Sequence, residues 1–303
     1  MDIDNFLVEK MKAFVILSNV RFPIFSIKAP EAFQVGQALP FPQPSALIGA
    51  LAYCIAIKNK VGSKDAIEKA KKIALAARAG GIPEKQFLIP SPIILWRFRI
   101  LDRAMELPKK GKGLPMWSEI KNAIEANNYV TAKRIIEIRT KDALYREYVF
   151  TTNILAVWVL STHDIEGKDL YAVQRFGDTE SLCTITSCMD LEVEIKYKDL
   201  IVTIFPSPVN CNGIKASIFS GEAILLKMCD ESRQIKWFYV PVKHYVVKLP
   251  RGGRVGVFQP TLIKLKYDRR VKVVEIPVDS LKRLVKKEDI FSNYDYIDVV
   301  ICR

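Results

Sequence analysis

The sequence predicts an α+β fold in which a mixed first part is followed by a C-terminal part made mainly of strands. Three observations predict it. Strand and helix patterns follow the order β–α–β–β–α–β over residues 1–192, a polar and basic stretch interrupts that order at about residues 102–147, and short strands with few helices fill residues 193–303.

Apolar runs and prolines define the first elements. Ala13–Leu17 is dense in β-forming residues and predicts the first strand. Closely spaced prolines then forbid a regular helix and favour an extended path. A nearly all-apolar helix follows Pro44-Ser45, where Ser45 is placed to cap the first turn. A second helix is expected over Lys64–Ala79, ending at Gly80-Gly81.

The second strand is expected over Ile93–Leu101, because alternation puts apolar side chains on one face and Arg97 and Arg99 on the other. The basic stretch after it is expected to be an insertion with one helix near Glu119–Ala126. A third strand, a short helix and a fourth strand complete this part, over Ile154–Leu160, Leu170–Phe176 and Leu182–Thr186.

The resulting element order is the ferredoxin-like (RRM-like) arrangement, which many RNA-binding domains use and which also hosts many other functions. We therefore expect a ferredoxin-like domain over residues 1–192 and a mainly β domain over residues 193–303. The C-terminal strands are expected over Leu200–Phe205, Ala223–Lys227, Ile235–Val240, His244–Lys248, Val255–Phe258, Thr261–Tyr267 and Val271–Ile276.

Net charge is the most informative bulk property. The chain has 46 Lys and Arg against 33 Asp and Glu, a formal charge of +13. Such an excess calls for an anionic partner, either nucleic acid, an anionic membrane or an acidic substrate. The longest apolar runs are strand-length, so a membrane-spanning segment is rejected, and no membrane is expected among the partners. Asp2 and Asp4 stand where a secretory signal is positive, so a cytoplasmic location is expected.

The six cysteines do not form a C-x-x-C pattern. The spacings of Cys183, Cys188, Cys211 and Cys229 fit no standard zinc site. We expect reduced, buried thiols, no metal and no cofactor.

Two segments carry more information than composition does. Leu39–Leu51 is a stiff, proline-rich segment that leads into a buried helix. The N-terminus of that helix is a natural place for a phosphate. The alternative is that the segment is only a structural entry loop. Arg175–Leu182 combines Gly177, which permits a tight turn, with a polar run able to hydrogen-bond its own backbone.

Together these segments resemble the fifth numbered family of Cas proteins, within the RAMP group of CRISPR proteins. The resemblance rests on P-x-P-S-x-L-I-G-A-L at the helix entry and on R-x-G-[DN]-[ST]-E-S-L in the later turn. It covers residues 11–60 and 150–190 well. The second motif looks most like members from archaeal type I-A complexes, whereas the first recurs in other RAMP families, including type III backbone subunits.

The resemblance implies a RAMP domain in which residues 102–147 form a thumb. It implies a non-catalytic guide-RNA-binding subunit of a type I, I-A-like, CRISPR surveillance complex (Cascade) of antiviral defence, which caps the 5′ handle of the crRNA. The implied partners are that handle, the Cascade backbone subunit, the large subunit and target DNA near the PAM.

Basic and glycine-rich positions are the candidate RNA contacts. Glycines let a backbone approach a phosphate closely and the flanking arginines can clamp it, although a Gly-Gly hairpin turn with solvated arginines explains the same pattern. The candidate contacts are Lys28, Ser45, Arg97, Arg99, Lys109, Lys110, Lys112, Arg175, Arg251, Gly252, Gly253 and Arg254.

Two alternatives remain open: a RAMP endoribonuclease that processes pre-crRNA, and a type III backbone subunit. Lys243-His244-Tyr245 contains the residue types that some family members use for cleavage. Neighbours in a strand point to opposite faces, so these three cannot converge on one phosphate. No P-loop, G-x-S-x-G or H-E-x-x-H motif occurs either. We expect no catalytic residues.

Overall fold

A computed structural model describes residues 11–30, 38–83, 86–98, 116–139, 141–177, 181–248, 254–291 and 293–302. Helices and strands are mixed and strands predominate, which confirms the coarse expectation of an α+β chain. The chain divides into two compact units, Met1–Ser91 with Tyr148–Arg303, and Pro92–Glu147. The boundary expected between residues 192 and 193 lies inside one long strand of the first unit.

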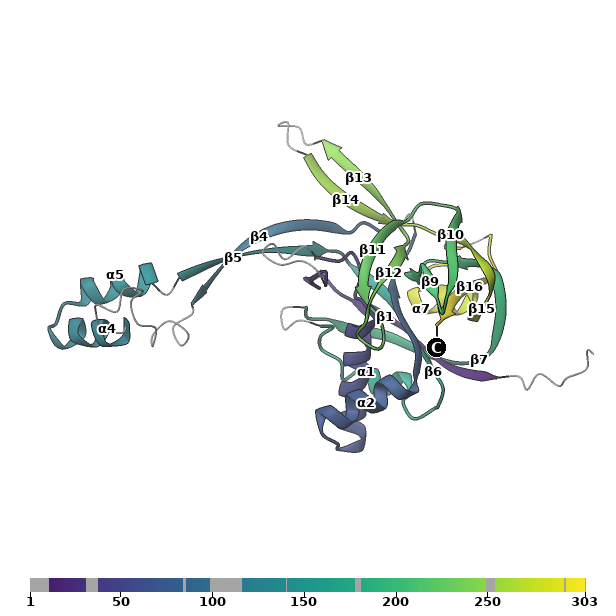
Figure 1. The fold of residues 1–303 in the computed structure, drawn as a ribbon, viewed down its shortest axis with the longest axis horizontal. Helices are drawn as coiled ribbons and strands as arrows, with labels where there is room; N and C mark the ends of the chain where they lie inside the picture. The colour runs from purple at the N-terminus through teal and green to yellow at the C-terminus, as the bar shows by residue number, and fades with distance from the viewer. Residues whose placement is uncertain are drawn as a thin grey trace, which may run out of the picture. The chain divides into compact units, whose positions relative to one another are not determined.

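The first unit is built on one large antiparallel sheet. Among the described residues this sheet has eight strands, in the order β3-β6-β1-β7-β15-β10-β9, with β16 paired to β15 (Figure 1). Its strands are β1 (Lys12–Arg21), β3 (Ala74–Gly80), β6 (Asn153–Leu160), β7 (Thr184–Thr203), β9 (Asn210–Cys211), β10 (Ile214–Ser220), β15 (Ile263–Pro277) and β16 (Tyr296–Ile301).

Strands β1 and β6 are buried on both faces, which explains why they read as continuous apolar runs. Ile16 and Trp158 point into a core shared with the first two helices, whereas Val15 and Val157 point into a core shared with the last helix. Period-2 alternation assigns neighbouring residues to these two cores. The helices of this unit are α1 (Pro44–Asn59), α2 (Ser63–Ile73), α6 (Gly167–Leu170) and α7 (Val278–Val285).

The expected helix over Lys64–Ala79 is wrong in its second half. Helix α2 ends at Ile73, and Ala74–Gly80 form β3, which pairs with β6. Alanine has the highest intrinsic helix propensity, so Ala74, Ala76, Ala77 and Ala79 suggested a helix. All four are fully buried in the sheet, and this burial outweighs their local preference. The expected helix over Leu170–Phe176 is also displaced, because α6 ends at Leu170.

The strand expected over Ile93–Leu101 does not join the main sheet. Strand β4 runs over Ile89–Phe98 in a separate sheet of order β2-β5-β4, so β3 is the second strand of the main sheet. The second unit contains a helix close to the expected one and a second helix that was not expected. The two helices are α4 (Met116–Glu125) and α5 (Tyr129–Arg139). The other strands of the separate sheet are β5 (Lys141–Phe150) and β2 (Ile24–Phe25).

The C-terminal strands were largely expected, but two are much longer than the sequence suggests. Strand β7 has 20 residues and β15 has 15, and β15 unites the strands expected over Thr261–Tyr267 and Val271–Ile276. Two smaller sheets, β11-β12-β8 and β13-β14, complete this region. Their strands are β8 (Ser207–Pro208), β11 (Ile224–Cys229), β12 (Ile235–Val240), β13 (Val242–Lys248) and β14 (Arg254–Pro260).

The expectation that every cysteine is reduced is wrong for two residues. Cys211 and Cys302 form a disulfide, with Cα atoms 5.1 Å apart. Pairing of β15 with both β10 and β16 brings these distant positions together, and their separation of 91 residues hides the bond from spacing rules. Cys54, Cys183, Cys188 and Cys229 are free thiols. Across the described part of the chain, no helix is long and apolar enough to span a membrane.

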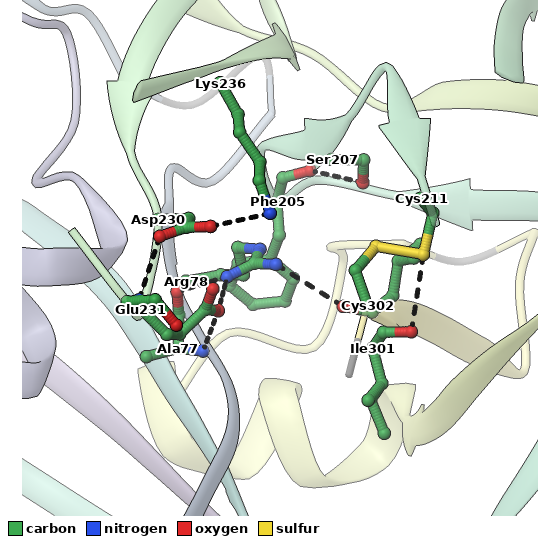
Figure 2. Close-up of polar contacts among 12 residues, drawn as sticks. Ala77, Arg78, Phe205, Ser207, Cys211, Asp230, Glu231, Lys236, Ile301 and Cys302 are labelled. Carbon is green, nitrogen blue, oxygen red and sulfur yellow. Dashed lines mark hydrogen bonds and ion pairs between the residues drawn. A yellow bond between two sulfur atoms is a disulfide. The ribbon is translucent and has the colours of Figure 1, made fainter. Parts of the chain in front are cut away.

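A buried ion pair joins three distant segments of the first unit. The guanidinium of Arg78, on β3, pairs with the carboxylate of Glu231 in the turn between β11 and β12 (Figure 2). The same carboxylate accepts the backbone N–H of Ala77 at 3.0 Å, and Nη2 of Arg78 donates to the carbonyl of Val300, on β16, at 3.5 Å. The Arg78 side chain is 2% exposed and lies 5.4 Å from the centroid of the Phe238 ring.

Replacing Glu231 with glutamine is expected to lower the free energy of unfolding by about 3 kcal/mol, because it leaves a guanidinium buried without its counter-charge. Denaturant unfolding of Glu231→Gln against the native protein measures this. The double variant Arg78→Met/Glu231→Leu should recover most of the loss. Glu68→Gln, at an exposed ion pair with Lys71, is the matched control and should leave the midpoint unchanged. A Glu231→Gln variant of native stability would contradict the assignment.

Candidate nucleic-acid interface

One cavity of the first unit, about 810 Å³ in volume, brings together the two sequence motifs. Its walls come from the extended segment after β2, the first turns of α1, the turn that contains Gly177, and the turn between β11 and β12. The lining residues are Ile27, Lys28, Gln43, Ser45, Ala46, Gly49, Ala50, Tyr53, Gln174, Arg175, Gly177, Leu182 and Arg233.

The N-terminus of α1 opens onto this cavity without a side-chain cap. Gln43, and not Ser45 as expected, is the N-cap residue, and its backbone is extended. The Gln43 side chain is used elsewhere, because its Oε1 accepts the backbone N–H of Cys229 at 2.9 Å. Ser45 lies in the first turn and contacts the Cys229 thiol, whose pKa is raised by burial more than this contact lowers it. An uncapped N-terminus keeps partial positive charge at the cavity wall.

The described residues of the second motif line another part of the cavity. Arg175 and Leu182 make an antiparallel bridge, and Gly177 between them has φ +80°, a left-handed conformation that favours glycine. Ser181 is fully buried, and its hydroxyl accepts the backbone N–H of Ser26 at 3.1 Å. This bond ties the motif to the segment that carries Lys28.

Three cationic side chains line the cavity: Lys28, Arg175 and Arg233. All three are exposed, and no Asp or Glu stands among the lining residues that the structure describes. Arg233 is held in place by its turn, in which the Asp230 carboxylate accepts the backbone N–H groups of Ser232 and Gln234 at 2.8 and 2.9 Å. Three converging cations beside a helix N-terminus favour a phosphate-bearing ligand.

An aromatic side chain adds a second kind of contact. Ser45, Gly49 and Tyr53 are spaced by four residues, so they share one face of α1. The Tyr53 ring is 46% exposed, and the absence of a side chain at Gly49 leaves the helix open beside it. An exposed ring next to phosphate-binding cations is suited to stacking on an unpaired base.

Of the expected contacts, Lys28, Ser45 and Arg175 meet in the cavity, and Arg254 does not. Arg254 lies in β14 opposite Lys248, on a different sheet. Arg97 lies in β4, in the second unit. The candidates that fall outside the described residues are Arg99, Lys109, Lys110, Lys112, Arg251, Gly252 and Gly253.

Sequence reasoning missed Tyr53, Gln174 and Arg233. The four-residue spacing from Ser45 was a usable signal for Tyr53. Arg233 carried no such signal, because its place beside α1 depends on the contacts of Gln43 and Glu231 with segments far away in the sequence.

The Lys243-His244-Tyr245 segment lies in β13, away from the cavity lining. The His244 ring packs beside Phe258, with centroids 5.2 Å apart, and over Gly256, where an added Cβ would lie 2.8 Å from Nε2. Lys243 pairs with Glu222 at 2.7 Å and lies over the Tyr245 ring. His244 therefore packs apart from Lys243 and Tyr245, which contact each other.

Two curated proteins are similar to this chain. CRISPR-associated protein Cas5 from Methanocaldococcus jannaschii is 30% identical over 195 residues, which is 61% of this chain and 66% of that protein. CRISPR-associated protein Cas5 from Thermoproteus tenax is 26% identical over 244 residues, 78% of this chain and 89% of that protein. No protein-family model matches the chain.

Two solved structures are also similar, at low sequence identity. A crystal structure of a CRISPR protein from Archaeoglobus fulgidus has a TM-score of 0.44 and 15% identity, covering 84% of this chain and 99% of that one. A chain of a CRISPR RNA-guided surveillance complex has a TM-score of 0.34 and 11% identity, covering 85% and 91%.

Removing one cavity cation should weaken binding of a single-stranded oligonucleotide and flatten its salt dependence. Arg175→Ala or Arg233→Ala is expected to reduce the slope of log affinity against log salt by about 0.7, the share of one phosphate contact. Fluorescence anisotropy across a salt series measures the slope. Lys72→Ala, at an exposed lysine of α2 outside the cavity lining, is the control. Equal slopes for all variants would exclude this cavity as the phosphate site.

Proposed function

Because the chain belongs to the Cas5 family of CRISPR-associated proteins, we propose that it binds guide RNA as a non-catalytic subunit of a type I surveillance complex. The cavity carries the proposal, since it unites both family motifs with three cations and lacks carboxylates among its described lining residues. The formal charge of +13 supports the same class of ligand.

The finer proposal is that the cavity holds the 5′ handle of the crRNA in a complex of type I-A character. A guide RNA is single-stranded at its handle, so its bases are free to stack on an exposed ring such as Tyr53 while its phosphates meet Arg175 and Arg233. The Cascade backbone subunit, the large subunit and target DNA near the PAM are the further proposed partners, in the cytoplasm.

We also infer a ferredoxin-like RAMP domain in the first unit. The strand order β3-β6-β1-β7 supports it, because these strands are second, third, first and fourth in the chain order of that domain. In this proposal the second unit, Pro92–Glu147, is the thumb.

The separation of His244 from Lys243 and Tyr245 supports a non-catalytic role. General acid–base cleavage needs its groups within hydrogen-bond reach of one phosphate. His163, the other histidine of the chain, packs beside Phe14 with ring centroids 4.9 Å apart.

Expression together with its CRISPR locus should yield a protein that co-purifies with short RNAs sharing one 5′ sequence. Sequencing the bound RNA from the native protein and from Arg175→Glu/Arg233→Glu measures this, and the variant should lose the shared sequence because charge reversal repels the handle phosphates. Lys72→Glu is the matched control. Random RNA, or none, on the native protein would reject the proposal.

Incubation of the purified protein with repeat RNA separates the proposed role from that of an endoribonuclease. Intact RNA agrees with a binding subunit. Cleavage that is abolished in His244→Ala would replace the proposal.

A further inference from the structure

The outward face of the hairpin formed by β11 and β12 exposes large side chains. Alternation sends Met228 and Phe238 inward, where they are buried. Residues that alternate with these two point outward. Among them, the exposed fraction is 49% for Leu225, 50% for Ile235 and 47% for Trp237. We call Leu225, Lys227, Ile235 and Trp237 the Trp237 face.

At the centre of the Trp237 face an ammonium group lies against the indole. Lys227 and Trp237 are direct cross-strand partners, and the Lys227 Nζ lies 5.0 Å from the ring centroid. A base that stacks on this indole would bring its phosphate within reach of the same ammonium. A tryptophan beside a lysine can therefore contact both the base and the phosphate of one nucleotide.

The carboxylates in the segments that border this hairpin are engaged within the molecule. Asp230 pairs with Lys236 at 2.7 Å, Glu231 pairs with the buried Arg78, and Glu222 pairs with Lys243 at 2.7 Å. None of these anions is left to repel a polyanion. Lysine is also depleted in the cores of protein interfaces, so an aromatic and aliphatic face with Lys227 at its centre fits RNA better than a protein partner.

The Trp237 face adjoins the cavity through β11 itself. Cys229, the last residue of β11, shares the outward side with Lys227 by alternation, contacts Ser45, and donates its backbone N–H to Gln43. Ser45 and Gln43 line the cavity, and so does Arg233 in the turn that follows. Lys227 is two residues from Cys229 along the strand, a distance of about 7 Å.

We propose that the Trp237 face is a stacking platform for the single-stranded RNA that continues out of the cavity. Trp237 supplies the stacking surface, Lys227 neutralises the adjoining phosphate, and Leu225 and Ile235 exclude water from the flanks. This inference deepens the proposed function and rests on it. The platform recognises RNA by stacking and charge, so it tolerates any base.

Two lengths of guide RNA test the platform. A 5′ fragment cut to the first few nucleotides fills the cavity alone, and the complete repeat-derived 5′ segment extends beyond it. Trp237→Ala should bind the short RNA as the native protein does and the long RNA about tenfold more weakly. Trp237→Phe should retain most of the affinity for the long RNA, because a phenyl ring still stacks.

Tyr296→Ala is the matched control, because Tyr296 lies on another strand, β16, and is 48% exposed. The Lys196 ammonium lies 5.8 Å from the Tyr296 ring centroid, in the way that the Lys227 ammonium lies beside the Trp237 ring. This variant should bind both RNAs as the native protein does. Native affinity of Trp237→Ala for the long RNA would overturn the platform, while a loss in Arg175→Ala would leave the proposed function standing. Loss of a co-purifying protein subunit, with RNA affinity intact, would identify a protein-docking face instead. Unchanged binding in Arg175→Ala would overturn both.

Discussion

The buried pair between Arg78 and Glu231 is the interaction on which the candidate site depends. It links β3, in the first part of the chain, to the turn between β11 and β12, and the guanidinium also reaches the carbonyl of Val300 on β16. Removing two charges from water is costly, so a buried pair adds little net stability. Removing only one partner is strongly destabilising, because the other charge stays buried without a counter-charge. The pair therefore specifies one arrangement of the turn, and that arrangement places Arg233 at the cavity.

The site is assembled from parts that are individually ordinary. An uncapped helix N-terminus, a glycine turn and three exposed cations each occur in many proteins. Their convergence is what indicates a polyanion: Ser181 fastens the Gly177 turn to the segment of Lys28, and Gln43 fastens the end of β11 to the start of α1. Three of the chain's positive charges are thus held at defined positions around one cavity.

Local patterns predicted those elements whose burial agrees with their propensity. The apolar run Ile154–Leu160 and the strand Ile235–Val240 were predicted within a residue of their observed bounds. Ala74–Gly80 was not, because alanine favours a helix until β6 supplies a partner strand. Lys28, Ser45 and Arg175 were predicted as contacts and line the cavity, whereas Arg233 and the Cys211–Cys302 bond depend on tertiary contacts that no local window contains.

A double-mutant cycle on RNA binding tests the central claim most directly, namely that the buried pair acts on the site by positioning Arg233. The affinity for the guide-RNA 5′ segment would be measured for Glu231→Gln, Arg233→Ala and the double variant, under conditions where circular dichroism shows all three folded. If Glu231 acts through Arg233, the double variant should bind about as weakly as Arg233→Ala alone, because both changes remove one contact. Strictly additive losses, or native affinity in Glu231→Gln, would contradict the account.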